Sequence, residues 1–246
     1  MSERGLVIAG HRGAMAVAPE NTLAGFRRGV ADGADQLEFD VRVSRDGHLV
    51  VMHDATVDRT TDGTGAVADL TWAEVRSLDA GNGERVPELR EVWEAFPDVD
   101  FQVEIKDPAA LAGVLALART APHVAGVTIT SFHYDVVTTA LAADGPWRVG
   151  LISGATEREK LLRGLAEHAT PATEPADDRY VVLVHRELAD EPAVTAYRAR
   201  GGRTCTWVIR EAVEVAAVLE QGWCGITMDD PAIGVAARDA WLAAHA

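Results

Sequence analysis

QLEFDVRVSRDGHLVVMH, residues 36–53, contains two strand-like runs separated by Asp46-Gly47, a dipeptide typical of a two-residue hairpin turn. Such a turn makes the two strands antiparallel, whereas parallel neighbours need a crossover of about a dozen residues or more. Leu49–His53 is therefore predicted to be a hairpin arm on Gln36–Val43. It does not count as a strand of a parallel sheet.

Elsewhere the chain alternates short apolar runs with longer stretches of helical periodicity. The other strand-like runs are Leu6–Gly10, Phe101–Lys106, Gly126–Ser131, Trp147–Ile152, Tyr180–His185, Thr204–Ile209 and Gly225–Met228. The helical stretches are Thr22–Asp32, Ala109–Ala121, Asp135–Ala143, Glu157–Ala169, Glu191–Arg200, Glu211–Gln221 and Pro231–Ala244. Without the hairpin arm, eight parallel strands remain, and 246 residues match the usual barrel length of about 250. We predict an α/β fold, a single (β/α)₈ TIM barrel over residues 1–246.

Two segments interrupt this alternation. Residues 54–87 are rich in Asp, Thr and Gly, with one short helix-like piece at Trp72–Ser77. They form a predicted small insertion after the second strand, at the barrel face where substrates bind. The segment Thr170–Arg179 contains two prolines and several acidic residues, and is predicted to be a mobile connection.

The composition excludes several classes of partner. A net charge of -15, from 38 acidic and 23 basic residues, is the opposite of a nucleic-acid binder's charge. No apolar stretch approaches 18 residues, so no membrane insertion is expected. The run Leu6–Ala9 is too short for a signal peptide, and a cytoplasmic location is predicted.

The two cysteines, Cys205 and Cys224, are predicted to be buried free thiols. The oligomeric state is not predicted.

Acidic side chains occur on strands that would otherwise be apolar. Glu38 and Asp40 are two residues apart and share one face of their strand, as do Glu104 and Lys106 on theirs. Three carboxylates converging at one barrel mouth would repel one another without a cation between them. Oxygen ligands suit Mg²⁺ or Ca²⁺ better than Zn²⁺. Glu38, Asp40 and Glu104 are therefore predicted to bind a divalent metal ion, although salt-bridged acids are the alternative.

Two histidines are candidates for acid–base chemistry beside that metal. If Arg45 faces His48 across a two-residue turn, counting outward places His53 directly opposite Asp40, although a slip of one residue would move it to the other face. His11 ends the first strand, and is followed by Arg12, which can hold a phosphate. Two histidines flanking a phosphate could act as general acid and base.

Residues that follow the first strand are also informative. Gly13 permits a tight turn after Arg12. Asn21 is the predicted N-cap of the first helix, and Glu20 is close enough in sequence to reach the site.

An ordered set of motifs resembles the glycerophosphodiester phosphodiesterase family. The motifs are His11-Arg12-Gly13, Pro19-Glu20-Asn21-Thr22, Glu38-Phe39-Asp40-Val41, Ser44-Arg45-Asp46-Gly47, Val50-Val51-Met52-His53-Asp54, Asp58-Arg59-Thr60-Thr61, Leu78-Asp79-Ala80-Gly81, Val86-Pro87, Glu104-Ile105-Lys106, Ser131-Phe132, Trp207-Val208 and Thr227-Met228-Asp229-Asp230-Pro231. The resemblance covers nearly the whole chain, most densely its first 110 residues or so.

This resemblance implies a (β/α)₈ barrel related to phosphatidylinositol-specific phospholipases C, which hydrolyses glycerophosphodiesters to glycerol 3-phosphate and an alcohol. It implies Mg²⁺ or Ca²⁺ on the three carboxylates, acid–base catalysis by the two histidines, and phosphate binding by Arg12 and Lys106. Trp207 would line the glycerol side of the pocket. This sequence departs from the family in having Ile209-Arg210 where an asparagine often follows the Trp-Thr-Val run.

Several questions stay open at the level of sequence. The substrate could instead be a lysophospholipid, as for lysophospholipase D enzymes on the same barrel, or the barrel could bind a ligand without catalysis. The nucleophile is either water or a glycerol hydroxyl that first forms a cyclic phosphate. Which histidine is the acid and which is the base is not decided, nor is the preferred head group.

Overall fold

Eight parallel strands close into a barrel in the computed structural model, which describes residues 5–120, 123–169 and 178–245. The strands of the ring, in order, are β1 (Val7–Gly10), β2 (Gln36–Val43), β4 (Asp100–Ile105), β5 (Val127–Ser131), β6 (Arg148–Ser153), β7 (Tyr180–His185), β8 (Arg203–Ile209) and β9 (Gly225–Met228). β9 pairs with β1, which closes the ring. The predicted TIM barrel is confirmed. Most of the predicted connection Thr170–Arg179 lies outside the described residues.

The ninth strand, β3 (Leu49–Val51), pairs antiparallel with β2 outside the ring, as predicted. Its predicted register is wrong by one residue. Val41 faces Val51, and the Met52 backbone N–H donates to the Asp40 carbonyl at 2.9 Å, so Asp40 faces Met52 and not His53. The turn contains three residues, because Ser44 pairs with His48 and Gly47 adopts a positive φ of 88°. A type I turn followed by a left-handed residue gives this length.

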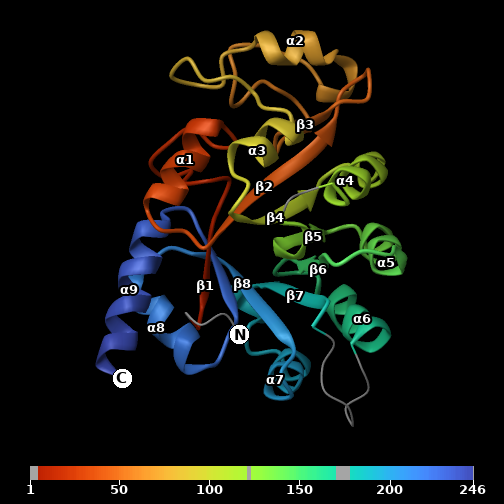
Figure 1. Cartoon of the computed structure of the whole chain (residues 1–246). Coiled ribbons are helices and arrows are strands. Elements are labelled where there is room, and N and C mark those ends of the chain that lie inside the picture. Colours follow the sequence, from red (N-terminus) through yellow and green to blue (C-terminus); the bar gives the residue numbers. More distant parts are fainter. Residues whose placement is uncertain (1–4, 121–122, 170–177, 246) are drawn as a thin grey trace.

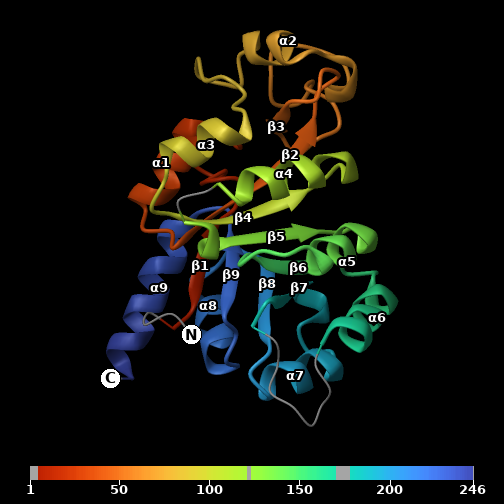
Figure 2. The same ribbon diagram turned by 45° about the vertical axis from the view of Figure 1, so that its right-hand side comes forward.

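Helices follow the strands around the outside of the barrel, except α2, which lies in the insertion (Figures 1 and 2). They are α1 (Leu23–Ala31), α2 (Trp72–Ser77), α3 (Leu89–Ala95), α4 (Leu111–Ala118), α5 (Tyr134–Ala142), α6 (Arg158–His168), α7 (Pro192–Ala199), α8 (Ala212–Glu220) and α9 (Pro231–Ala244). Short 3₁₀ turns lie at Val67–Asp69, Pro108–Ala110, Val124–Gly126 and Arg186–Leu188. The sequence did not predict α3, which crosses from the insertion back to β4.

The start of α1 also differs from the prediction. Thr22 is the N-cap, since its hydroxyl oxygen accepts the Gly25 backbone N–H at 3.0 Å. Asn21 has a positive φ of 55°, which turns its side chain toward Asp40 instead. Asparagine tolerates this conformation better than most residues. Asn21 therefore belongs to the site that the barrel builds.

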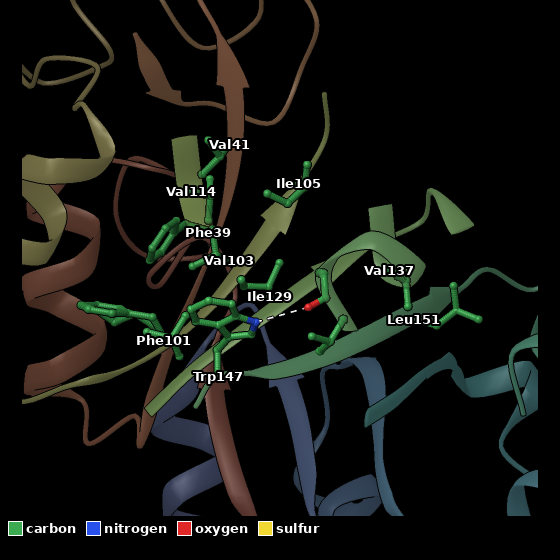
Figure 3. Close-up of a cluster of buried hydrophobic side chains, with 14 of the residues drawn as sticks. Phe39, Val41, Phe101, Val103, Ile105, Val114, Ile129, Val137, Trp147 and Leu151 are labelled. Atoms are coloured by element: carbon green, nitrogen blue, oxygen red, sulfur yellow. Dashed lines mark hydrogen bonds between the residues drawn. The ribbon is translucent and has the colours of Figure 1, made fainter. Parts of the chain in front are cut away.

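The main hydrophobic core lies between the strands and the surrounding helices. Figure 3 shows one part of it, where Phe39 and Phe101 pack 5.6 Å apart between ring centroids, close to Val103 and Ile129. Trp147, which is fully buried, directs its indole N–H toward the Ala140 carbonyl at 3.5 Å. This packing between strands and helices fixes the strands, so that the side chains at their carboxyl ends are held in place.

The insertion has a small core of its own. Its buried apolar residues are Val50, Met52, Val57, Val67, Val75, Ala80 and Val86. Figure 1 shows this segment, which includes α2, projecting beyond the end of β2. The insertion is therefore a packed unit fixed to one side of the barrel.

Within the described part of the chain, no helix combines the length and apolar character needed to cross a membrane. Cys205 and Cys224 are free thiols, and both are half-buried rather than buried as predicted.

Candidate active site

A pocket with a cavity volume of about 100 Å³ opens at the carboxyl end of the barrel. Its polar side is formed by residues from the ends of β1, β2 and β4 and from the chain after β3: His11, Arg12, Glu38, His53, Gln102, Glu104 and Lys106. Its apolar side includes Phe132, Ile152, Leu183 and Trp207. Parallel barrels place their reactive groups at this end.

Three buried carboxylates form the floor of the site. Glu38, Asp40 and Glu104 each offer an oxygen, and these atoms lie within 4.8 Å of one another. Burial and the charge of Asp40 raise the pKa of Glu104 to about 8 and that of Glu38 to about 6. The three groups thus resist carrying full negative charge together, and an all-oxygen set of this kind fits a hard divalent cation. The residues could hold a metal ion.

Two cations flank this acidic cluster. Lys106 Nζ lies 2.5 Å from Glu104 and 3.3 Å from Asp40, and Arg12 Nε lies 3.4 Å from Asp40. Burial alone would raise the pKa of Asp40, but the charges of Lys106 and Arg12 outweigh it and lower that pKa. Asp40 is therefore the carboxylate of the cluster that remains ionised most readily. Positive side chains also face the pocket, where an anionic ligand could meet them.

Both histidines line the same pocket as Glu38 and Glu104, and an aspartate contacts each of them. His11 Nδ1 lies 2.6 Å from an Asp229 carboxylate oxygen, and His53 Nδ1 lies 2.6 Å from Asp54. With Nδ1 engaged, each ring has Nε2 left for a ligand, and His11 Nε2 is 4.0 Å from Glu38. Such a carboxylate partner fixes both the ring orientation and the tautomer.

Their environments shift the pKa values of the two histidines in opposite directions. Burial opposes the charged form of His11, but its hydrogen bond with Asp229 and the charge of Glu38 outweigh burial and raise its pKa. Burial lowers the pKa of His53, and the nearby carboxylates of Asp40 and Asp54 do not fully offset it.

The turn after β1 joins the first strand to the acidic cluster through its backbone. The Arg12 N–H donates to Glu38 at 2.9 Å, and the Arg12 carbonyl accepts the Asn21 N–H at 3.0 Å. The Asn21 side chain then donates to Asp40 at 2.9 Å. Arg12 itself has a positive φ of 48°. These contacts place the Arg12 guanidinium against both Asp40 and Glu20.

The structure brings together all of the residues predicted for the site. Seven of them line the pocket: His11, Arg12, Glu38, His53, Glu104, Lys106 and Trp207. Asp40 lies in the carboxylate cluster below it. Trp207 packs edge-on against Phe132, with ring centroids 5.7 Å apart, in the apolar part of the pocket lining.

Several residues of the site were not predicted. Asp229 follows β9 and Asp54 follows His53, and both orient histidines. The rule that places reactive groups after barrel strands could have found Asp229. No sequence signal pointed to Asn21, whose contribution depends on a positive φ.

A TIM barrel whose pocket holds a carboxylate cluster, two aspartate-bound histidines and the cations Arg12 and Lys106 defines a class of barrel protein suited to reactions of anionic ligands. The model of the "Glycerophosphoryl diester phosphodiesterase family" matches residues 11–233, and the chain belongs to that family.

Relatives and solved structures agree with this membership. A glycerophosphodiester phosphodiesterase of Caldanaerobacter subterraneus is 53% identical over 108 residues, which are 41% of this chain and 44% of that protein. The alignment thus spans less than half of the relative's length. A glycerophosphodiester phosphodiesterase structure from Agrobacterium tumefaciens has a TM-score of 0.76 and 26% identity, and covers 94% of this chain and 99% of that one. A phosphodiesterase of Oleispira antarctica, solved with the product sn-glycerol-3-phosphate, has a TM-score of 0.81 and 25% identity over 95% and 96% of the two chains.

Proposed function

We propose that this protein hydrolyses glycerophosphodiesters to glycerol 3-phosphate and an alcohol, with the barrel and its insertion acting as one domain. The observation that carries the proposal is the presence of His11 and His53 in a single pocket with the buried carboxylate cluster. The product bound to the Oleispira phosphodiesterase gives independent support for the substrate class.

Glu38, Asp40 and Glu104 would hold the metal ion, Mg²⁺ or Ca²⁺. When bound, the ion would supply positive charge beside the phosphate oxygens and stabilise the transition state. The pKa of about 8 at Glu104 describes a carboxylate that a cation would keep ionised at neutral pH. The same donor set disfavours Zn²⁺, which prefers nitrogen and sulfur ligands.

Arg12 and Lys106 would bind the phosphodiester. Both face the pocket, where they could donate to phosphate oxygens once a ligand competes with their present carboxylate partners. An arginine offers two parallel N–H groups to a phosphate, whereas a lysine acts as a point charge. The two residues would fix the phosphorus between the histidines.

His11 and His53 would move the protons. One ring would accept a proton through Nε2 from the nucleophile, which is either water or a glycerol hydroxyl that first forms a cyclic phosphate for water to open, and the other ring would donate a proton to the leaving alkoxide. Asp229 and Asp54 would hold the rings in the required tautomers during both transfers. The apolar wall with Trp207 and Phe132 would exclude water from the glycerol carbons.

The test is the release of glycerol 3-phosphate from a panel of glycerophosphodiesters by EDTA-treated protein, before and after Mg²⁺ or Ca²⁺ is restored. We expect turnover that is lost with EDTA and regained with metal, and loss of nearly all turnover in H11A and H53A. Turnover that resists EDTA, or normal turnover in either variant, would contradict the corresponding part of the proposal. Faster turnover of lysophosphatidylcholine than of glycerophosphocholine would move the substrate class to lysophospholipids.

A further inference from the structure

One arginine of the insertion pairs with two carboxylates that each contact a residue of the pocket. Arg59 lies between Glu20, in the loop before α1, and Asp54, the first residue of the insertion. Its Nη1 and Nη2 are each 2.8 Å from a different oxygen of Glu20. Its Nε lies 2.6 Å from one oxygen of Asp54, and Nη2 lies 3.1 Å from the other. A single guanidinium therefore makes a two-pronged contact with each of two carboxylates.

Each of these carboxylates also contacts a residue of the pocket. The Glu20 oxygen that binds Arg59 Nη2 accepts Arg12 Nη1 at 2.9 Å. The Asp54 oxygen that binds Arg59 Nη2 is the one 2.6 Å from His53 Nδ1. Arg59 is therefore linked to Arg12 through Glu20, and to the His53 ring through Asp54.

Arg59 itself is not placed to bind substrate. It is not among the residues that line the pocket, and its side chain is 48% exposed. All three of its nitrogens face carboxylates, so its charge is already neutralised. The geometry requires a planar fork, which an ammonium group cannot reproduce.

We propose that Arg59 is a positioning residue, which orients Arg12 through Glu20 and His53 through Asp54 at the same time. Through Asp54 and Arg59, the insertion contributes to the organisation of a site whose other residues lie outside the insertion. The inference rests on the proposed function for the roles of Arg12 and His53. The contacts themselves do not depend on that function.

Steady-state kinetics of R59A, R59K and the control R76A test the proposal. Arg76 pairs with Glu91 at 2.8 Å, also links the insertion to the barrel, and is 39% exposed, but it contacts nothing in the site. In R59A we expect kcat/KM to fall about 10- to 100-fold, the usual range for residues that orient a reactive group. Because both Arg12 and His53 are affected, kcat should fall and KM should rise. R59K should recover little of this loss, added guanidinium should recover part of it in R59A, and R76A should stay within about twofold of the wild type.

A second measurement does not require turnover. In ¹⁵N-histidine NMR spectra, the Nδ1 signal of His53, assigned with H53Q, should shift or broaden in R59A and stay unchanged in R76A. The His11 signal should stay unchanged in both. If wild-type protein hydrolyses no phosphodiester, the proposed function fails, and this spectrum alone decides the role of Arg59. An unchanged His53 signal in R59A would overturn the proposal, as would R59A kinetics equal to those of R76A. A rise in KM alone would assign Arg59 to direct substrate binding and overturn it equally.

Discussion

Gly13 is the glycine on which the site depends most directly, and the substitution Gly13→Ala tests this dependence. Gly13 has a φ of 92°, and an added Cβ would lie 2.6 Å from the Gly25 carbonyl carbon and 2.9 Å from the Phe26 nitrogen. These are backbone atoms of α1, which cannot rotate away. Alanine therefore meets two separate penalties here, one from backbone conformation and one from packing.

Gly47 provides a control that separates the two penalties. It has nearly the same φ, 88°, but an added Cβ would meet nothing within 4 Å. Alanine in a left-handed conformation costs about 1–2 kcal/mol, and its lower entropy in the unfolded chain returns about 0.4–1 kcal/mol. Gly47→Ala should therefore destabilise the fold by about 1 kcal/mol. Overpacking adds about 1–3 kcal/mol, so Gly13→Ala should cost about 2–4 kcal/mol.

Thermal and urea unfolding of both variants measure these free energies. For a chain of this size the loss in Gly13→Ala corresponds to a Tm lower by about 5–15 °C. Because the displaced turn carries His11 and Arg12, the folded fraction of this variant should also lose at least about tenfold in kcat/KM, since small misplacements of reactive groups are costly. Gly47→Ala should keep its activity. Equal stability losses in the two variants would refute the packing argument, and full activity in Gly13→Ala would refute the link between the turn and the site.

Three further predictions concern the pocket. Asp229→Asn should reduce kcat/KM about 10- to 100-fold without changing the circular dichroism spectrum, because His11 loses its charged partner; unchanged kinetics would contradict this. In EDTA-treated protein, the folded-state pKa of Glu104 is about 8, which is above its unfolded value of 4.5. The stability that Glu104 contributes is therefore fully present below about pH 4.5 and is lost as the pH rises through about 8. The Tm of metal-free protein should therefore fall more steeply across this range than that of Glu104→Gln, and equal pH dependences would contradict the assignment. Trp207→Ala should raise KM for glycerophosphocholine about tenfold with little change in kcat, because it removes a side chain beside Phe132 that is proposed to contact substrate both before and during the reaction. A fall in kcat alone would count against this.

The barrel could be predicted because its signals are local. Most strands are short runs rich in apolar residues, and the turn at Asp46-Gly47 correctly indicated that β3 is not one of the parallel strands. Helix α3 could not be predicted in the same way, because its seven residues offer fewer than two full turns of periodicity. Its Glu88–Glu91 capping box is formed by two glutamates, which are less distinctive at a helix start than serine or threonine.

Residues that act through backbone conformation or through a second side chain were harder to predict than those at strand ends. Asn21 reaches Asp40 because its φ is positive, and nothing in the sequence distinguishes it from an ordinary N-cap. Arg59 lies six residues beyond His53 in a loop, and its partners are 5 and 39 residues away. A pairing of that kind is decided by the folded insertion, not by spacing.

His53 lies in the pocket even though the argument that predicted its position used the wrong register. Alternation of side chains between two faces holds only while a strand remains in the ladder. β3 ends at Val51, and beyond it Arg42 Nε donates to the His53 carbonyl at 2.8 Å, which holds the chain after it has left the sheet. The one-residue slip therefore reverses the faces of Leu49–Val51 but does not determine where the His53 ring points. What brings His53 to the pocket is its place at the end of a strand that runs antiparallel beside β2, combined with the Asp54 carboxylate that binds its ring. Strand ends thus decide which residues can meet in this site, and contacts outside the ladder decide how they are oriented.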